Sequence, residues 1–219
     1  MKKTFYSILA VATVFLASCG GAEDAKAEEG KETKEKTEKE AEKPAGVSGT
    51  FSAAEGATIT WKAKHNKDAD WAHVGTMPVS GSVNVTDGAI ASGEFTLAVS
   101  MLDEGDGEYN EMLENHIQDS TFFNTAVFPT ATFTLASVTD AQATGTLSLL
   151  GMSQEITFDA TTSVTAEGVS VKGTAAIDLA SFGMPAIVGS LELPEEEKGE
   201  APSKDIEIDL DLNLAPAAM

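Results

Sequence analysis

Strict alternation of apolar and polar residues is the sequence feature that most limits what this chain can fold into. Near the C-terminus Ile206, Ile208, Leu210, Leu212 and Leu214 each follow an acidic residue or asparagine. Shorter runs of the same kind occupy residues 59–63, 79–85, 95–101, 131–135, 147–149, 156–160, 169–171 and 175–179. This period of two indicates half-buried antiparallel strands, and turn residues such as Asp87-Gly88 separate the runs. About eight strands with short hairpins predict an all-β fold, either an antiparallel up-and-down barrel or a sandwich.

One internal segment departs from the alternation. Between Glu108 and Phe123, the residues Tyr109, Met112 and His116 recur at spacings of three and four, with Leu113 beside them. This spacing predicts a short amphipathic helix. A helix inserted between strands is expected to cover one mouth of a barrel.

The N-terminus has the pattern of an export signal. Lys2 and Lys3 precede an apolar stretch from Phe5 to Leu16, and small residues lead to Cys19. The stretch is too short to span a bilayer, which needs about 20 apolar residues. The pattern resembles a bacterial lipoprotein signal, so we expect residues 1–18 to be removed and the Cys19 thiol to carry a diacylglyceryl group. The alternative is an ordinary secretory peptide in which the cysteine is incidental.

Residues 19–46 are expected to form a disordered tether. They contain Gly, Ala, Glu, Lys and Thr, and no large apolar residue occurs before Val47. Such a segment cannot bury enough surface to offset its ordering entropy, and as a coil it spans on the order of 30 Å. The folded domain is therefore predicted at residues 47–219. We expect lipid anchoring in the bacterial cell envelope, at the outer membrane facing the periplasm, with exposure at the cell surface left open.

The charge balance excludes one class of partner. The chain has a formal net charge of −21 and contains no arginine, and from Gly46 onward 26 acidic residues face 6 lysines. Nucleic-acid binding needs clustered basic residues, so it is excluded. Adhesion to anionic lipid headgroups is disfavoured for the same reason, so membrane contact must come from the acyl chains on Cys19. Because Cys19 is the one cysteine in the sequence, no disulfide can stabilise the domain.

The sequence contains no recognisable catalytic constellation. The spacing of His65, His73 and His116 matches no metal-binding motif, so we expect ordinary polar histidines and no metal. There is no G-x-S-x-G elbow, no thiol in the body of the chain and no glycine-rich phosphate loop. We therefore expect neither an enzyme nor a bound cofactor.

Five segments together resemble the YceI-like family of periplasmic polyisoprenoid- or lipid-binding proteins, which have a lipocalin-like barrel. They are His73-x-Gly75, the series from His116 to Phe123, Phe128–Phe133, Gly145–Ser153 and Ser181–Met184. The resemblance runs from about residue 49 to residue 214. It implies a barrel that holds a hydrophobic, lipid-like molecule.

The resemblance and the alternation together suggest residues for such a site. The expected wall residues are Trp61, Phe95, Leu97, Met101, Phe133, Leu147, Leu149 and Phe158. Phe122 and Phe123 are expected to line the mouth or to anchor the helical segment. His73 and His116 are expected to contact a headgroup, or else each other and the backbone. Family members often carry arginine at the positions of Leu113 and Leu179, so headgroup preference does not carry over.

Two other functions remain open from the sequence. A barrel filled by its own side chains would act as an envelope or surface protein-interaction module, because fold does not dictate function. An enzyme is the third alternative, although no reaction suggests itself. The sequence also leaves open the ligand's identity and whether the barrel forms a homodimer.

Overall fold

The computed structural model describes residues 46–70, 72–105, 110–139 and 141–217. The predictions made for the signal peptide, for Cys19, for the tether up to residue 45 and for Tyr109 lie outside the described residues. Among the residues that are described, no helix has the length and hydropathy needed to cross a bilayer.

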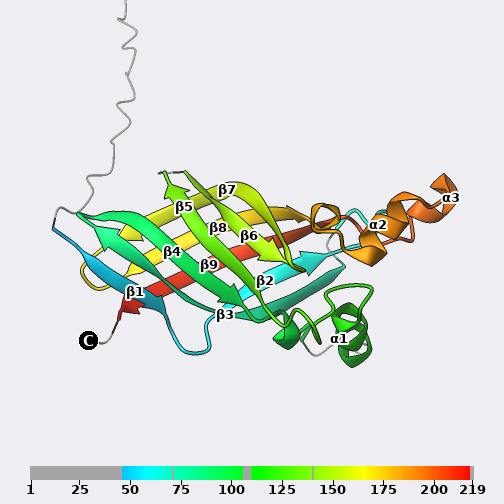
Figure 1. Ribbon diagram of the computed structural model, residues 1–219, viewed down its shortest axis with the longest axis horizontal. Helices are drawn as coiled ribbons and strands as arrows, with labels where there is room; N and C mark the ends of the chain where they lie inside the picture. The colour runs from blue at the N-terminus through cyan, green and yellow to red at the C-terminus, as the bar shows by residue number, and fades with distance from the viewer. Residues whose placement is uncertain (1–45, 71, 106–109, 140, 218–219) are drawn as a thin grey trace, which may run out of the picture. The chain divides into compact units, whose positions relative to one another are not determined.

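Antiparallel strands pair in chain order and close on themselves (Figure 1). The strands are β1 (Gly49–Ala53), β2 (Thr58–Ala63), β3 (His73–Thr86), β4 (Ala89–Leu97), β5 (Ala131–Val138), β6 (Gln142–Leu149), β7 (Met152–Val164), β8 (Val169–Asp178) and β9 (Asp205–Pro216). From β3 to β9 each strand pairs with the next, and β2 pairs with both β3 and β9. The predicted lipocalin-like, antiparallel up-and-down barrel of eight strands is confirmed.

The nine strands fill eight positions because β1 and β2 share one. Both strands pair with β3 and β9. β1 pairs with residues 82–85 of β3 and 214–216 of β9, whereas β2 pairs with residues 73–78 of β3 and 207–209 of β9. The Val79 amide donates to the Ala57 carbonyl at 2.9 Å, which ties the short break between them to β3. The alternation did not predict β1, and it split β8 into two runs.

Two helical connections lie at the same end of the barrel (Figure 1). The first joins β4 to β5 and contains η1 (Val99–Met101) and α1 (Asn110–Gln118). The second joins β8 to β9 and contains η2 (Leu179–Phe182), α2 (Pro185–Leu191) and α3 (Glu195–Lys198). The prediction of a helix between residues 108 and 123 is confirmed by α1, but the expectation of a single helical insertion is incomplete. Sequence periodicity missed the second connection because its helices are only one or two turns long.

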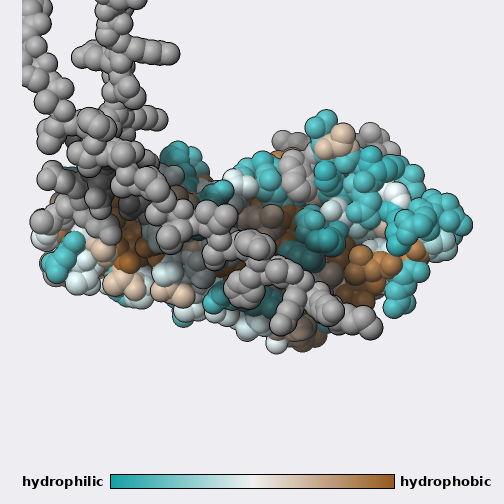
Figure 2. Space-filling model, turned by 90° about the horizontal axis from the view of Figure 1, so that it is seen from above, coloured by the Kyte–Doolittle hydropathy of each residue, from teal (hydrophilic) through white to brown (hydrophobic). Residues whose placement is uncertain are grey.

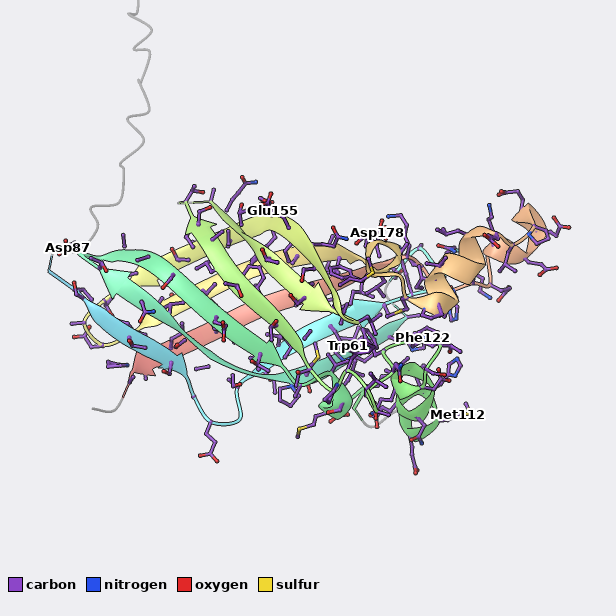
Figure 3. All side chains as sticks on the ribbon, in the orientation of Figure 1. Trp61, Asp87, Met112, Phe122, Glu155 and Asp178 are labelled. Atoms are coloured by element: carbon purple, nitrogen blue, oxygen red, sulfur yellow. The ribbon has the colours of Figure 1, made fainter. Side chains whose placement is uncertain are left out.

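The faces of these helices also differ from the expectation. Met112 is 65% exposed and points away from the barrel, whereas Ile117 packs against the core (Figure 3). In the second connection Phe182, Met184 and Ile187 are almost completely buried. Val188 on the outer side of α2 is exposed, and Figure 2 shows an apolar area beside the polar side chains of the α2–α3 end. The two connections therefore close this end of the barrel with an apolar layer.

The segment after η1 is hydrogen-bonded to β3 at Thr76, directly beside Gly75. Asp103 and Thr76 exchange two backbone hydrogen bonds, of 2.7 and 2.9 Å, and the Trp61 indole donates to the Asp103 carbonyl at 3.3 Å. A Cβ on Gly75 would lie 1.9 Å from that carbonyl oxygen and 2.6 Å from the indole nitrogen. Only a residue without a side chain therefore fits at this position.

Replacing Gly75 by alanine is expected to lower the free energy of unfolding by about 2–3 kcal/mol, because the added methyl forces backbone and indole apart. The matched control is Gly189→Ala in α2, where a Cβ meets nothing within 4 Å. Alanine there should leave stability unchanged or raise it by up to about 1 kcal/mol. Urea denaturation of both variants measures the difference, and equal stabilities would show that the Gly75 contact is not a close one.

Candidate functional site

The barrel interior contains an apolar cavity of about 110 Å³. It lies toward the end opposite the helical connections, where short turns join β3 to β4, β5 to β6 and β7 to β8, and is named here the turn-end cavity. Its lining residues are Ile59, Val79, Val83, Ile90, Phe95, Leu97, Phe133, Leu135, Val138, Ala143, Leu147, Ile156, Phe158, Thr162, Val171, Ala175, Ile177, Ile208, Leu210 and Leu212. Inward-facing positions of most strands contribute to it. Among the described residues, none in this lining carries a charge.

A second cavity, also of about 110 Å³, lies under the helical connections and is named here the helix-end cavity. Its lining residues are Trp61, Ala63, Lys64, Met77, Leu97, Val99, Leu102, Ile117, Phe122, Phe123, Ala131, Leu147, Leu149, Ile177, Leu179, Ile187, Pro202, Ser203, Ile206 and Ile208. Strand residues form its sides, and α1, α2 and the adjoining loops cover it. Figure 3 places Trp61 and Phe122 at this same end of the barrel.

Four aliphatic side chains separate the cavities. Leu97, Leu147, Ile177 and Ile208 line both of them and come from β4, β6, β8 and β9. The two cavities therefore lie in line, divided by a thin layer of flexible hydrocarbon. Displacing these side chains would join the cavities into one tunnel.

Several inward-facing aromatic residues are not fully packed. Phe95, Phe133 and Phe158 point into the barrel yet are only half-buried, because they border the turn-end cavity. The rings of Phe133 and Phe158 meet edge to face at 5.8 Å between centroids and leave the space beside them open. An apolar cavity of about 150 Å³ is enough to bind benzene, so each cavity here matches a small hydrocarbon group.

The predicted wall residues mostly lie where the sequence placed them. Those that line at least one cavity are Trp61, Phe95, Leu97, Phe133, Leu147, Leu149 and Phe158. Met101 does not: it is 62% exposed, because β4 ends at Leu97 and the alternation gives way to the turn of η1. Contact of any of these residues with a ligand stays a prediction.

The predicted polar contacts lie outside both linings. His73 Nδ1 lies 2.5 Å from Glu104 Oε1, and its ring meets His65 edge to face. His116 lies 3.3 Å from Asp119 and packs against Phe122. Each histidine thus has its own carboxylate partner, and neither faces the cavities. Over the described part of the chain, His, Asp and Glu nowhere form a group of three or more suited to a metal ion.

The turn after α1 positions two of the predicted mouth residues. Asp119 Oδ1 accepts hydrogen bonds from the amide and the hydroxyl of Thr121, both at 2.6 Å, and Phe122 and Phe123 follow directly and line the helix-end cavity. The Thr121 hydroxyl, then its amide, hold the pKa of the Asp119 carboxyl below its usual value of 3.8. An ionised Asp119 therefore stabilises the turn that carries this part of the cavity wall.

Some lining residues were missed by sequence reasoning. Ile177 and Ile208 lie within alternating runs, so the pattern contained the signal but gave no reason to rank them above other inward residues. Ile187 lies on a helix that the sequence did not reveal. Lys64 lies two residues after Lys62, so continued alternation would place it on the outer face, yet it lines the helix-end cavity.

The fold and the two cavities define a class: a small lipocalin-like barrel that closes around a mostly apolar, incompletely filled interior. The family model of the YceI-like domain matches residues 45–214, so the chain belongs to this family. No curated protein matches the chain.

Solved structures with the same fold include BcnA from Burkholderia cenocepacia (18% identity, TM-score 0.55), covering 71% of this chain and 94% of that one. A polyisoprenoid binding domain from Saccharophagus degradans, implicated in plant cell wall breakdown, has 14% identity and a TM-score of 0.55 and covers 78% and 100%. The YceI protein of Campylobacter jejuni has 18% identity and a TM-score of 0.51 and covers 64% and 82%. At these identities the likeness establishes the fold alone.

Acid is expected to loosen the Asp119 turn. Because folding lowers the pKa of this carboxyl, its stabilisation is present above the unfolded pKa and is lost as the pH falls through the lower folded value. Asp119→Ala should therefore lose less stability than the wild type between about pH 5 and pH 2. Thermal melts over this range measure the effect.

Two further variants control for the loss of a carboxylate. Asp119→Asn keeps an acceptor for Thr121 but cannot ionise, so it should resemble the alanine variant in pH dependence and have a neutral stability between those of the alanine variant and the wild type. Glu155→Gln removes one carboxylate from the exposed outer face of β7. If Glu155→Gln flattened the pH profile as much as Asp119→Ala, the turn would not be the cause.

Proposed function

We propose that this barrel binds a long-chain hydrophobic molecule, of polyisoprenoid, quinone or fatty-acyl type, along its two cavities, and sequesters or transports it in the cell envelope. The observation that carries the proposal is that inward-facing aromatic and aliphatic side chains border unfilled apolar space on both sides of the dividing layer. The Saccharophagus degradans domain of the same fold, described as polyisoprenoid binding, supports it.

The energetics favour a chain that occupies both cavities. Burying a methylene group stabilises a complex by about 0.8 kcal/mol, so ten carbons contribute about 8 kcal/mol, the scale of micromolar affinity. The loss of translational and rotational freedom offsets several kcal/mol of this. One cavity of about 110 Å³ holds too few carbons to bind tightly. Useful affinity therefore requires displacement of the dividing layer and occupation of the whole tunnel.

One observation favours a second function, a protein-interaction module. Exposed large apolar residues gather around the helical end and on the strand ends next to it: Val74, Met101, Met112, Val127, Met152, Val188 and Leu191. Such residues are typical of contact surfaces. In this second function the interior volume has no role, and a variant that fills it changes stability only.

Leu97→Trp distinguishes the two functions, because Leu97 lines both cavities. The larger side chain should block the tunnel and lower uptake of a long-chain alcohol at least tenfold, with a loss of stability of about 1–3 kcal/mol. Native mass spectrometry measures the uptake. The matched control is Leu191→Trp on α2, which is 53% exposed and lines neither cavity. Equal uptake by both variants, or no uptake by the wild type, would favour the interaction module.

Trp61 reports where the chain binds. It is 4% exposed and lines the helix-end cavity. In a Trp71→Phe background, a long-chain alcohol brominated along its chain should quench Trp61 fluorescence in saturable fashion, because bromine quenches on contact. The same alcohol without bromine is the control. Saturable binding without quenching would place the chain outside the helix-end cavity.

In this proposal Cys19 carries the lipid anchor, and the carrier lies at the outer membrane facing the periplasm. The support is the signal-like segment before Cys19 and the apolar-poor segment up to residue 46. Cys19→Ala should move the protein from the membrane to the soluble fraction of the envelope and abolish labelling by radioactive palmitate. A Cys19→Ala protein that still sediments with membranes would show that another feature holds it there.

A further inference from the structure

Two of the three histidines lie side by side at the end of the β2–β3 pair. His65 follows the last residue of β2 by two positions, and His73 is the first residue of β3. Their rings meet edge to face, with 5.8 Å between centroids and 69° between ring planes. His116 differs, because its ring neighbour is Phe122, at 4.9 Å. The hairpin therefore brings two imidazoles, eight positions apart in the sequence, into contact.

Each of the two rings is bound through Nδ1 to a carboxylate. His65 Nδ1 lies 3.3 Å from Asp68 Oδ2, and His73 Nδ1 lies 2.5 Å from Glu104 Oε1. An ionised carboxylate only accepts hydrogen bonds, so Nδ1 carries the proton in both rings and Nε2 keeps its lone pair. Among the described residues neither Nε2 has a hydrogen-bond partner. This is the arrangement found in metal-ligating histidines, in which the other ring nitrogen donates to a carboxylate that fixes the tautomer and the ring orientation.

Both supporting carboxylates are themselves held in place. The His65 backbone forms a bridge with Pro202, and its amide donates to Asp68 Oδ2 at 3.1 Å. That amide holds the pKa of the Asp68 carboxyl below its usual value of 3.8, and the bond to the His65 ring adds to this effect. On the other side the Glu104 amide donates to Glu114 Oε1 of α1 at 3.0 Å. The two rings are thus oriented by groups from different connections of the barrel.

The spacing of the rings suits a shared metal ion. Two Zn–N bonds of about 2.0–2.1 Å at a tetrahedral angle place imidazole centroids roughly 5 Å apart. The observed 5.8 Å is within about 1 Å of this spacing, so small side-chain rotations are enough. Both side chains are half-buried, which leaves them open to solvent on one side. In the described part of the chain no third His, Asp or Glu completes a group with them, so water must supply the remaining ligands.

We infer that His65 and His73 together bind a divalent transition-metal ion, Cu²⁺ more tightly than Zn²⁺, through their Nε2 atoms. Imidazole nitrogen suits these ions, whereas Mg²⁺ and Ca²⁺ prefer oxygen ligands. Neither histidine lines a cavity, so the inference does not rest on binding of a hydrophobic chain.

The surrounding charge favours a cation. The chain has a formal net charge of −21, which attracts cations at long range. Of the two lysines nearest in sequence to His65, Lys67 forms an ion pair with Glu200. The Lys64 ammonium donates to the Ala69 carbonyl at 3.3 Å. Two carboxylates directly behind the rings therefore face lysines that are already engaged.

The test is metal titration of the full chain with Cys19→Ser, which removes the thiol as a competing soft ligand. Calorimetry with Cu²⁺ and with Zn²⁺ is run at about pH 7.5 in excess Mg²⁺, which occupies surface carboxylates. We expect one site, and electron paramagnetic resonance of the Cu²⁺ complex should show coupling to two nitrogen atoms. His65→Ala and His73→Ala should each raise the Kd for Cu²⁺ at least tenfold and reduce the coupling to one nitrogen.

Two further variants control for the two parts of the arrangement. His116→Ala removes a histidine that also lies beside a carboxylate, Asp119 at 3.3 Å, but has no second imidazole as its neighbour, so the Kd should not change. Glu104→Gln leaves both rings in place and removes the charge behind one of them. It should raise the Kd about tenfold and retain the coupling to two nitrogen atoms. Thermal melts without metal establish that all variants are folded.

The nitrogen count and the control decide the outcome. Two coupled nitrogen atoms that are lost with His65→Ala or His73→Ala, but not with His116→Ala, would support the shared site. Coupling to a single nitrogen in the parent protein would overturn it, since the two rings would then not share an ion. Equal losses of affinity with all three histidine variants, or an affinity that no histidine variant changes, would also overturn it, because binding would then be dispersed over the surface.

Discussion

The closure of the sheet between β2 and β9 is the contact on which the interior depends. Only three residue pairs join these strands, Thr60–Asp209, Trp61–Ile208 and Lys62–Glu207. On the outside Lys62 bridges Glu207 and Asp209 of β9, and its pKa is raised by the hydrogen bond to Asp209 and then by that to Glu207. On the inside Trp61 and Ile208 face the helix-end cavity. Together with the β1–β9 pairs, this short seam closes the barrel, and it holds part of the wall of the helix-end cavity.

The sequence could predict the barrel because alternation is a local property that survives folding. The runs at 79–85 and 206–214 lie within strands, and the turn at Asp87-Gly88 joins β3 to β4 as expected. The sequence could not predict that β1 and β2 share one position in the barrel, because this depends on which residues of β3 and β9 each of them pairs with. The second helical connection was missed because its short helices show no period. Alternation also fails at the ends of strands, and Met101 and Lys64 are both residues beyond such an end.

The sequence could predict many of the residues that line the candidate site, but not the shape of the cavities. Inward-facing residues such as Leu97 and Phe158 have the same sequence pattern whether they fill a barrel or line a cavity. The difference lies in how far opposite walls stand apart, which is set by strand tilt and by the residues facing one another. The two histidines lie outside the linings for a related reason: a polar residue at a strand or helix end pairs with the nearest carboxylate, as His73 does with Glu104. Sequence spacing does not reveal that partner.

The pairing of Phe51 with Pro216 links the first strand of the barrel to the last. A wall closed by such distant segments is complete only after the whole domain has been made, so the apolar faces of the earlier strands cannot be covered by β9 before then. Open sheets with free edges tend to aggregate. Glu207, Asp209 and Asp211 alternate along β9, and carboxylates of this kind oppose pairing with other copies until the strand reaches its own edges. The acidic residues that face outward on the closing strand therefore disfavour edge-to-edge pairing between copies before the barrel closes.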